Sequence, residues 1–279
     1  MPLPGKEIRV CSWIELVKEL HSNNVVPIQP GSGDHHRSPY LFRGMDNAKW
    51  ELTTSLQFLA KKPGTDTFLV ERALIRAFRK YANAGAFDEK SAWYVMAAAQ
   101  HNGLPTRCLD WTSSPFVAAH FACSDERRKQ DDGVIWCLDC GVLRDINERS
   151  TSMASGLKGL AWVYDTRLLE KAFRDPEAFT TRLLPGAVML VWEPPSIDAR
   201  IANQCGLFTI MNHPDDSPNA FLLKHCAQCS DLVLRFVIDA KAKPEIRDML
   251  DQNGVTERTL FPGLPGLCQY LKRYYAKVW

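Results

Sequence analysis

The stretch that most constrains the fold is residues 100–122, QHNGLPTRCLDWTSSPFVAAHFA. It opens with a polar run in which Gly103 and Pro105 lie two residues apart, a spacing that ends a helix and imposes a bend. A short strand at residues 109–112 then meets a Ser-Ser-Pro sequence, which is typical of a capped helix start. The apolar run that follows is rich in small residues and predicts a closely packed helix. The sequence therefore predicts a strand that delivers polar side chains to the start of a buried helix.

Charged and hydroxyl side chains gather at this bend and at the strand that follows it. His101 and Arg107 precede the strand, Asp110 lies within it, and Thr112 and Ser113 lie at its end. Free backbone N–H groups and the helix dipole favour an anion at a helix start of this kind. The alternative is a hydrogen-bonded turn in which Arg107 and Asp110 pair structurally. The stretch is thus a candidate ligand site, with both interpretations open.

Residues 40–44, YLFRG, predict an apolar strand that ends in Arg43 and Gly44. A buried guanidinium requires an anionic partner. That partner is either a protein carboxylate, with Asp110 and Glu71 as the candidates, or a phosphate or carboxylate of a ligand. Gly44 has no side chain, which would let a ligand approach the backbone there.

Two polar positions later in the chain also lie at the ends of predicted strands. Glu193 closes the apolar strand 188–193 and precedes two prolines, whereas Gln204 stands just before a glycine and a new strand. A carboxylate at such a place can stabilise developing positive charge, while an amide supplies a hydrogen bond without charge. His101 is the candidate general base for the same site.

Composition restricts the class of protein. The chain has 279 residues, 46% of them hydrophobic, which is ample for a large core. Its net charge of +2 creates no global field that demands a nucleic acid, although a local basic groove is compatible with it. We find no apolar run of membrane-spanning length and no export signal, and the odd count of 9 cysteines suits a reducing compartment. We therefore expect a cytoplasmic protein without a membrane partner.

Two Cys-x-x-Cys pairs, Cys137/Cys140 and Cys226/Cys229, raise the question of zinc. The first pair continues an apolar strand, where neighbouring side chains alternate between faces, and the turn residues typical of a zinc knuckle are sparse. Plain buried cysteines are the favoured interpretation, so no metal is expected.

No internal repeat or low-complexity linker divides the chain. Alternating short strands and amphipathic helices predict a single α+β domain with a central, mostly antiparallel split sheet flanked by helices. Residues 1–39 are expected to form an N-terminal strand, helix and loop extension, and residues 40–279 the main domain. The cleft of that domain is expected to be bordered by Arg43, His101, Asp110, Thr112 and Gln204.

The chain also resembles a known family. The sequence QHNGLPTRCLDWT is similar to the signature of the FRG-domain family, named for a Phe-Arg-Gly tripeptide that is present here as residues 42–44. Residues 200–208 and 259–264 resemble further family blocks, so the likeness spans about residues 40–275 in four ordered blocks.

A second resemblance concerns the order of the polar positions. In ADP-ribosyltransferases of the Arg–Ser–Glu type, an early strand ends in Arg, a second carries a Ser/Thr run, and a late strand carries the catalytic Glu. Arg43 with Gly44 resembles the first motif, and Trp111 with Thr112 and Ser113 the second. The resemblance implies NAD as substrate: an Arg43 clamp on the pyrophosphate, Thr112 supporting the nicotinamide ribose, and Trp111 as a stacking wall. Arg107, Gly44 and Ser113 complete the expected NAD-binding set.

The third motif departs from the pattern, because Gln204 stands where the resemblance expects a Glu. Glu193, Asp110 and His101 are the other candidates for that catalytic role. The expected function is transfer of ADP-ribose from NAD to a macromolecule, with RNA or DNA favoured over protein as acceptor. The cell context that this suggests is a toxin or anti-phage defence effector, with an antitoxin as a candidate partner. The alternatives are a non-catalytic nucleotide or nucleic-acid binding module, or a hydrolase that uses His101 and Asp110.

Overall fold

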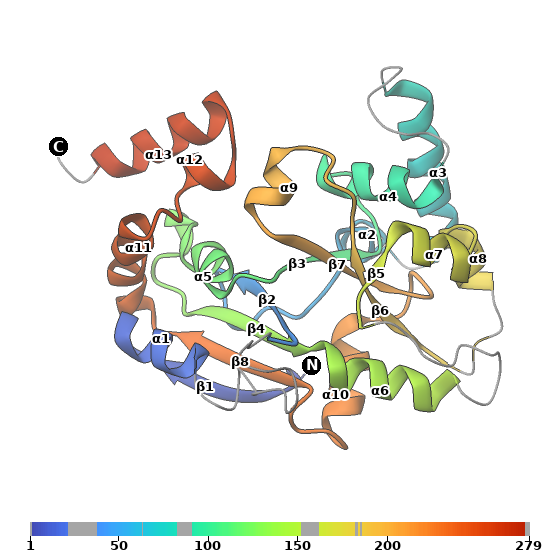
Figure 1. Cartoon of the computed structure of the whole chain (residues 1–279), viewed down its shortest axis with the longest axis horizontal. Helices are drawn as coiled ribbons and strands as arrows, with labels where there is room; N and C mark the ends of the chain where they lie inside the picture. The colour runs from blue at the N-terminus through green and yellow to red at the C-terminus, as the bar shows by residue number, and fades with distance from the viewer. Residues whose placement is uncertain are drawn as a thin grey trace, which may run out of the picture.

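The strands of the computed structural model form one eight-stranded sheet in the order β1-β8-β4-β2-β3-β7-β6-β5 (Figure 1). The structure describes residues 2–21, 38–62, 64–82, 91–151, 162–181, 184 and 186–276, without the side chains of residues 150 and 151. The strands are β1 (Lys6–Val10), β2 (Tyr40–Met45), β3 (Cys108–Thr112), β4 (Gly133–Asp139), β5 (Tyr164–Asp165), β6 (Met189–Glu193), β7 (Gly206–Met211) and β8 (Val233–Ile238).

The neighbouring strands are antiparallel in the centre of the sheet and parallel at its two edges, where β1 pairs with β8 and β5 with β6. β2 pairs with β4 along its whole length from Tyr40 to Met45. With β3, on its other side, it pairs only at Phe42 and Thr112. The predicted α+β fold with a mostly antiparallel sheet is confirmed, and the sheet splits between β2 and β3.

Helices cover both faces of this sheet (Figure 1). They are α1 (Trp13–Leu20), α2 (Ser55–Leu59), α3 (Thr67–Tyr81), α4 (Ala92–His101), α5 (Pro115–Cys123), α6 (Cys140–Thr151), α7 (Thr166–Ala172), α8 (Pro176–Thr181), α9 (Ala199–Asn203), α10 (Pro218–Cys226), α11 (Lys243–Gln252), α12 (Glu257–Leu260) and α13 (Leu264–Ala276), with the short 3-10 turns η1 (Glu126–Arg128) and η2 (Ala240–Ala242). Among the described helices, none has the length and apolar character that crossing a bilayer requires.

The first 21 residues are part of the sheet layer rather than a separate appendage. β1 pairs in parallel with β8 along five residues, and the buried side of α1 joins the same core as β8 and α11. Residues 22–37 of the expected N-terminal extension lie outside the described residues.

One face of the sheet carries two separate hydrophobic cores. The first lies where α1, α5 and α11 cover strands β1, β8, β4 and β2, and it includes Phe42. The second lies where α4, α7 and α8 cover β3, β6 and β7, and it includes Cys108 and Phe208. On the opposite face a single core runs beneath both halves and includes Leu41, Trp111 and Val191. The split in the sheet therefore opens between the two cores of the first face.

The central stretch folds as its sequence indicates. α4 ends at His101, and Gly103 adopts a left-handed φ of 83° that reverses the chain. β3 follows, and the side chain of Ser114 then caps α5 by accepting a hydrogen bond from the Val117 N–H, with Pro115 in the first turn. Each step depends on residues within a few positions, which is why the pattern predicts it.

Gly44 is explained by α5 rather than by a ligand. A Cβ on Gly44 would overlap the carbonyl oxygen of Ala118 and lie 2.7 Å from the backbone nitrogen of Ala122. The alanines of α5 likewise allow the helix backbone to approach β2 closely. This corrects the expectation that the missing side chain makes room for a bound cofactor, although Gly44 does lie at the edge of the cavity described below.

The substitution Gly44→Ala is therefore expected to lower the free energy of unfolding by about 3 kcal/mol or more, because the obstacle is helix backbone that cannot rotate away. The matched control is Gly186→Ala, since nothing lies within 4 Å of a Cβ built at Gly186. Chemical denaturation of both variants measures the difference. Equal stabilities would contradict the close contact between β2 and α5.

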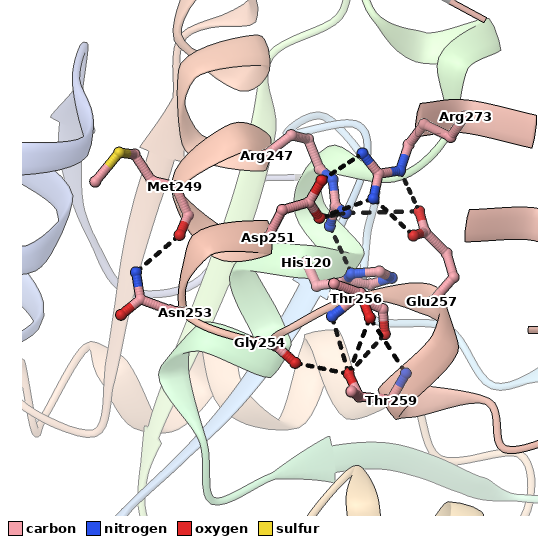
Figure 2. Close-up of polar contacts among 10 residues, drawn as sticks. All are labelled: His120, Arg247, Met249, Asp251, Asn253, Gly254, Thr256, Glu257, Thr259 and Arg273. Carbon is pink, nitrogen blue, oxygen red and sulfur yellow. Dashed lines mark hydrogen bonds and ion pairs between the residues drawn. The ribbon is translucent and has the colours of Figure 1, made fainter. Parts of the chain in front are cut away.

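A buried polar cluster joins the carboxyl-terminal helices to α5 (Figure 2). Arg273 on α13 binds the carboxylates of Glu257 and Asp251, with donor–acceptor distances of 2.7 to 2.9 Å. Arg247 on α11 also binds Asp251, at 3.0 Å, and donates to Nδ1 of His120 at 2.5 Å. The cluster thus fixes α12 and α13 against α11 and α5 with both carboxylates neutralised.

His120 is 1% exposed, and burial together with the neighbouring Arg247 lowers the pKa of its imidazole to about 3. The unfolded chain, with an ordinary histidine pKa of about 6.5, binds a proton over the range in which the folded protein does not. The free energy of unfolding is therefore expected to fall as the pH decreases below about 6.5, by up to about 1.4 kcal/mol per pH unit from this group.

Urea denaturation of the wild type and His120→Gln between pH 7 and pH 5 tests this expectation. Gln keeps a side-chain acceptor for Arg247 but does not titrate, so the variant should show a shallower dependence on pH. Parallel curves for the two proteins would mean that His120 does not determine the acid sensitivity.

Candidate functional site

A cavity of about 700 Å³ lies at the split between β2 and β3. It brings together residues from positions 42–44, 53–55, 100–112, 121 and 194–208. Its lining includes all five side chains that the sequence placed at the cleft, namely Arg43, His101, Asp110, Thr112 and Gln204. The same cavity is also lined by Gln100, Asp198, Arg200 and the aromatic side chains of Phe42, Phe121 and Phe208.

Arg43 reaches across the split to β3. Its Nη1 atom donates a 2.5 Å hydrogen bond to the carbonyl oxygen of Asp110, on the side of β3 that a continuous sheet would pair with β2. The Asp110 carboxylate is 3.8 Å away, and its side chain is 61% exposed. Burial lowers the pKa of the guanidinium, and the charge of Asp110 opposes that effect. The ion pair is loose because most of the carboxylate is in water.

The guanidinium of Arg43 is only partly satisfied by the protein. Its Nε atom is buried and has no hydrogen-bond partner among the described residues. Glu71, the other carboxylate that the sequence offered, is engaged elsewhere. A buried N–H donor without an acceptor is costly, and a bound anion in the cavity would satisfy it.

The Asp110 carboxylate is positioned by α4. Nε2 of Gln100 lies 3.1 and 3.0 Å from its two oxygens, and Oε1 of Gln100 accepts a 2.5 Å hydrogen bond from the Thr106 hydroxyl. This chain of hydrogen bonds fixes the orientation of the amide and so of the carboxylate. Asp110 therefore presents a fixed negative charge to the cavity.

His101 forms a pair that the sequence did not suggest. Its Nε2 atom lies 2.7 Å from Oδ2 of Asp198, a residue 97 positions later, and the imidazole side chain is 9% exposed. Burial raises the pKa of the Asp198 carboxyl, but hydrogen bonds from His101 and from the backbone N–H groups at the start of α9 outweigh it, and the net pKa is lowered. A carboxylate that orients an imidazole is the arrangement of a general base. The only local signal was that Asp198 caps α9.

Thr112 and Gln204 tie the two sides of the site together. The Thr112 hydroxyl donates to the backbone oxygen of Gln204 at 2.7 Å and accepts from the Ser114 N–H at 3.0 Å. The side-chain amide of Gln204 donates to the carbonyl oxygen of Leu260 at 3.1 Å. Both side chains line the cavity, but their hydrogen bonds mainly serve to hold β3, α9 and α12 in place.

Arg107 does not belong to this site. Its side chain is 2% exposed, and Nε donates to Glu71 at 2.7 Å, with Nη2 bound to the same carboxylate. Nη1 donates to the hydroxyl of Thr180 at 2.5 Å and to the backbone oxygen of Asn212 at 2.9 Å. The expectation that Arg107 binds a cofactor is corrected, because the N–H donors of its guanidinium already bind protein acceptors.

Three further expected positions differ in their surroundings from the roles proposed for them. Trp111 is among the residues that line the cavity, but its indole is 3% exposed, belongs to the core of the opposite face and donates to the Thr209 hydroxyl at 2.9 Å, so little of the ring is open to a stacking ligand. Ser113 is exposed, and its N–H donates to the Cys205 carbonyl at 3.1 Å. Glu193 is exposed at the end of β6 and does not line the cavity.

The cysteine pairs lie in or against the cores. Cys137 and Cys140 are buried, and they belong to the cores on the two opposite faces of the sheet. Cys226 and Cys229 pack against the core of the second face. Within the described part of the chain, no group of three or more His, Cys, Asp or Glu side chains has the arrangement to hold a metal ion.

A comparison with family models gives one result for this chain. The model of the FRG domain matches residues 38–131, which include β2, β3, α5 and the tripeptide of residues 42–44. The fold and cavity therefore define an α+β protein with a polar cleft at a split sheet, and residues 38–131 of it match the FRG domain. No curated protein and no solved structure matches the chain.

Arg107 stabilises the fold through its buried ion pair with Glu71. Arg107→Met is expected to lower the free energy of unfolding by about 3–5 kcal/mol, because it leaves the 3% exposed Glu71 carboxylate without its cation, with only the backbone N–H of residue 107 still donating to it. The double variant Arg107→Met/Glu71→Gln removes both charges and should recover part of that loss. Thermal melts measure both; an Arg107→Met protein as stable as the wild type would show that this guanidinium is not a structural group.

Proposed function

We propose that this protein is an NAD-dependent ADP-ribosyltransferase that modifies a macromolecule, with nucleic acid favoured over protein as acceptor. The observation that carries the proposal is that Arg43, Thr112 and Gln204 come from β2, β3 and the turn before β7, three neighbouring positions in the sheet, and line one cavity. That is the arrangement implied by the order of the motifs. A volume of about 700 Å³ lies in the range of nucleotide and cofactor sites.

Arg43 supplies the anion contact that NAD requires. Its buried Nε has no acceptor among the described residues, and its position in the split leaves the guanidinium facing the cavity. A pyrophosphate oxygen there would complete a charge-assisted, forked set of hydrogen bonds. The loose pairing with Asp110 leaves this donor available.

Asp110 takes the role that a glutamate has in the resembled enzymes. The bond between the ribose C1′ and nicotinamide breaks, nicotinamide leaves with the electron pair, and a new bond forms from C1′ to an oxygen or nitrogen of the acceptor. Asp110, oriented by Gln100, stabilises the positive charge that develops on the ribose. Gln204 carries no charge, and its amide is bound to Leu260.

His101 receives the proton that the acceptor loses in this step. Its Nε2 is held by Asp198, which stabilises the imidazolium that forms. This pair also favours a second candidate, a hydrolase in which His101 activates water. Transfer of label to a macromolecule distinguishes the first function, whereas release of nicotinamide without labelled product indicates the second. Binding of NAD without either outcome indicates a non-catalytic module.

The cell context remains that of a toxin or anti-phage effector acting in the cytoplasm, with an antitoxin as candidate partner. The support for it is the match of residues 38–131 to the FRG domain together with a cavity suited to nucleotide transfer.

Arg43→Ala is expected to abolish transfer of ³²P label from NAD to mixed DNA, RNA and protein acceptors, and to abolish any growth defect caused by induced expression. Losing a bidentate charged contact should cost about 2–5 kcal/mol of binding or transition-state stabilisation. Folding should change little, because the Asp110 carboxylate is 61% exposed and stays hydrated, and because the Asp110 carbonyl, which loses its Arg43 donor, borders the cavity where water can replace that donor. Arg43→Lys should fail as well, since an ammonium does not reproduce the planar fork.

Calorimetric titration of NAD and thermal melts are measured on the same samples. Arg127→Ala is the control, because that guanidinium is 89% exposed and, among the described residues, forms its ion pair with nearby Asp125. A large loss of melting temperature in Arg43→Ala without selective loss of NAD binding would make Arg43 a structural residue. Unchanged labelling in that variant would exclude the proposed site.

A further inference from the structure

Arg200 is a cation at the wall of the cavity. Its guanidinium lies 5.0 Å from the ring centre of Phe261, and its Nε is buried without a hydrogen-bond acceptor. The described residues provide no hydrogen bond or ion pair to this side chain. Phe121, which lines the cavity, contacts Phe261 edge-on at 6.1 Å between ring centres. Arg200 thus lies between the cavity and the aromatic pair of Phe121 and Phe261.

The same chemistry continues outward along α12 and α13. The guanidinium of Arg258 lies 5.4 Å from the ring centre of Tyr270, which stands 5.5 Å from the ring of Tyr274. Tyr274 in turn contacts Tyr275 at 5.3 Å, and these two side chains are 51% and 53% exposed. We call the set Arg200, Phe261, Arg258, Tyr270, Tyr274 and Tyr275 the arginine–tyrosine track.

The track is held rigidly against the body of the protein. The amide of Asn203 on α9 donates to the carbonyl oxygen of Thr259 on α12 at 2.8 Å. Gly266 lets α13 approach α12 so closely that a Cβ there would lie 2.6 Å from the Glu257 carbonyl oxygen. Arg273 then fastens α13 through Glu257 and Asp251 (Figure 2). Figure 1 shows α12 and α13 at one corner of the molecule, beyond α9 and α11.

The electrostatic balance of the track is positive. The two acidic groups beneath it, Asp251 and Glu257, are neutralised by Arg247 and Arg273. Arg200 and Arg258 have no acidic partner among the described residues. Arginines without acidic partners on the half-buried rings of Phe261 and Tyr270, followed by the exposed rings of Tyr274 and Tyr275, suit an occupant with phosphates and flat bases better than an apolar protein surface.

We propose that the arginine–tyrosine track binds single-stranded nucleic acid and leads it into the cavity, with Arg200 on the phosphate next to the nucleotide that enters. Bases stack on Tyr274 and Tyr275 at the outer end of the track, and Arg258 contacts the backbone between them and Arg200. His101, bound to Asp198 two residues before Arg200, then faces the entering nucleotide as the base. The modification of that nucleotide rests on the proposed function, whereas binding of the single strand to the track does not depend on it.

The test is fluorescence anisotropy of the full chain with a labelled 12-nucleotide single strand, as DNA and as RNA, and with the matching duplex. Tyr274→Ala/Tyr275→Ala changes only exposed side chains and is expected to weaken single-strand binding about tenfold or more. Arg200→Gln should weaken it and reduce the dependence on salt concentration. The matched control is Arg79→Gln/Tyr81→Ala on α3, which removes an exposed cation and a 75% exposed tyrosine far from the track and should leave affinity unchanged.

Equal losses in the control and track variants, or no binding of any single strand, would overturn the proposal. So would light scattering that shows self-association of the wild type and a monomer after Tyr274→Ala/Tyr275→Ala, because the track would then be a protein interface. Calorimetry with NAD separates the two proposals. If the protein binds single strands through the track but does not bind NAD, the transferase proposal is refuted and the proposal that the track binds nucleic acid is supported.

Discussion

The single residue pair between β2 and β3 is the constraint on which the rest of this structure depends. A sheet that continued beyond Phe42 and Thr112 would close the gap and use the Asp110 carbonyl in its ladder. Here the side chain of Arg43 satisfies that carbonyl instead, and the two hydrophobic cores on one face are kept apart. The cavity is the space that this separation leaves.

The arginines divide into two groups by how completely the protein satisfies them. Arg107 is surrounded by Glu71, Thr180 and Asn212, and Arg273 by Glu257 and Asp251, so both are structural. Among the described residues, Arg43, Arg200, Arg235 and Arg247 each have a buried Nε without an acceptor, and of these four Arg43 and Arg200 line the cavity. An unsatisfied buried donor costs free energy, so the two that lie at the cavity support the proposal that an anion binds there.

Close backbone packing explains features that otherwise look like ligand contacts. Gly44 is small because α5 passes directly over β2, and the alanines of α5 serve the same contact. That contact also fixes where α5 starts, and hence where Thr112 and Ser114 hold the end of β3. In the Phe-Arg-Gly tripeptide for which the FRG domain is named, Gly44 is therefore a packing residue, whereas Arg43 is the candidate ligand contact.

Much of this protein was determined by local sequence. The bend at Gly103, the cap at Ser114, the apolar strands and the cleft position of Arg43 follow from turn, capping and hydrophobic patterns that act within a few residues. Alternation along β3 also places the Asp110 and Trp111 side chains on opposite faces of the sheet, which explains why the Trp111 indole packs in the core of the opposite face. What only the tertiary structure decided are the partners: Asp198 for His101 and Glu71 for Arg107, 97 and 36 positions apart. Ion pairs and hydrogen bonds are short-ranged, and the chain brings such groups together only after the sheet has formed, so no local pattern encodes them.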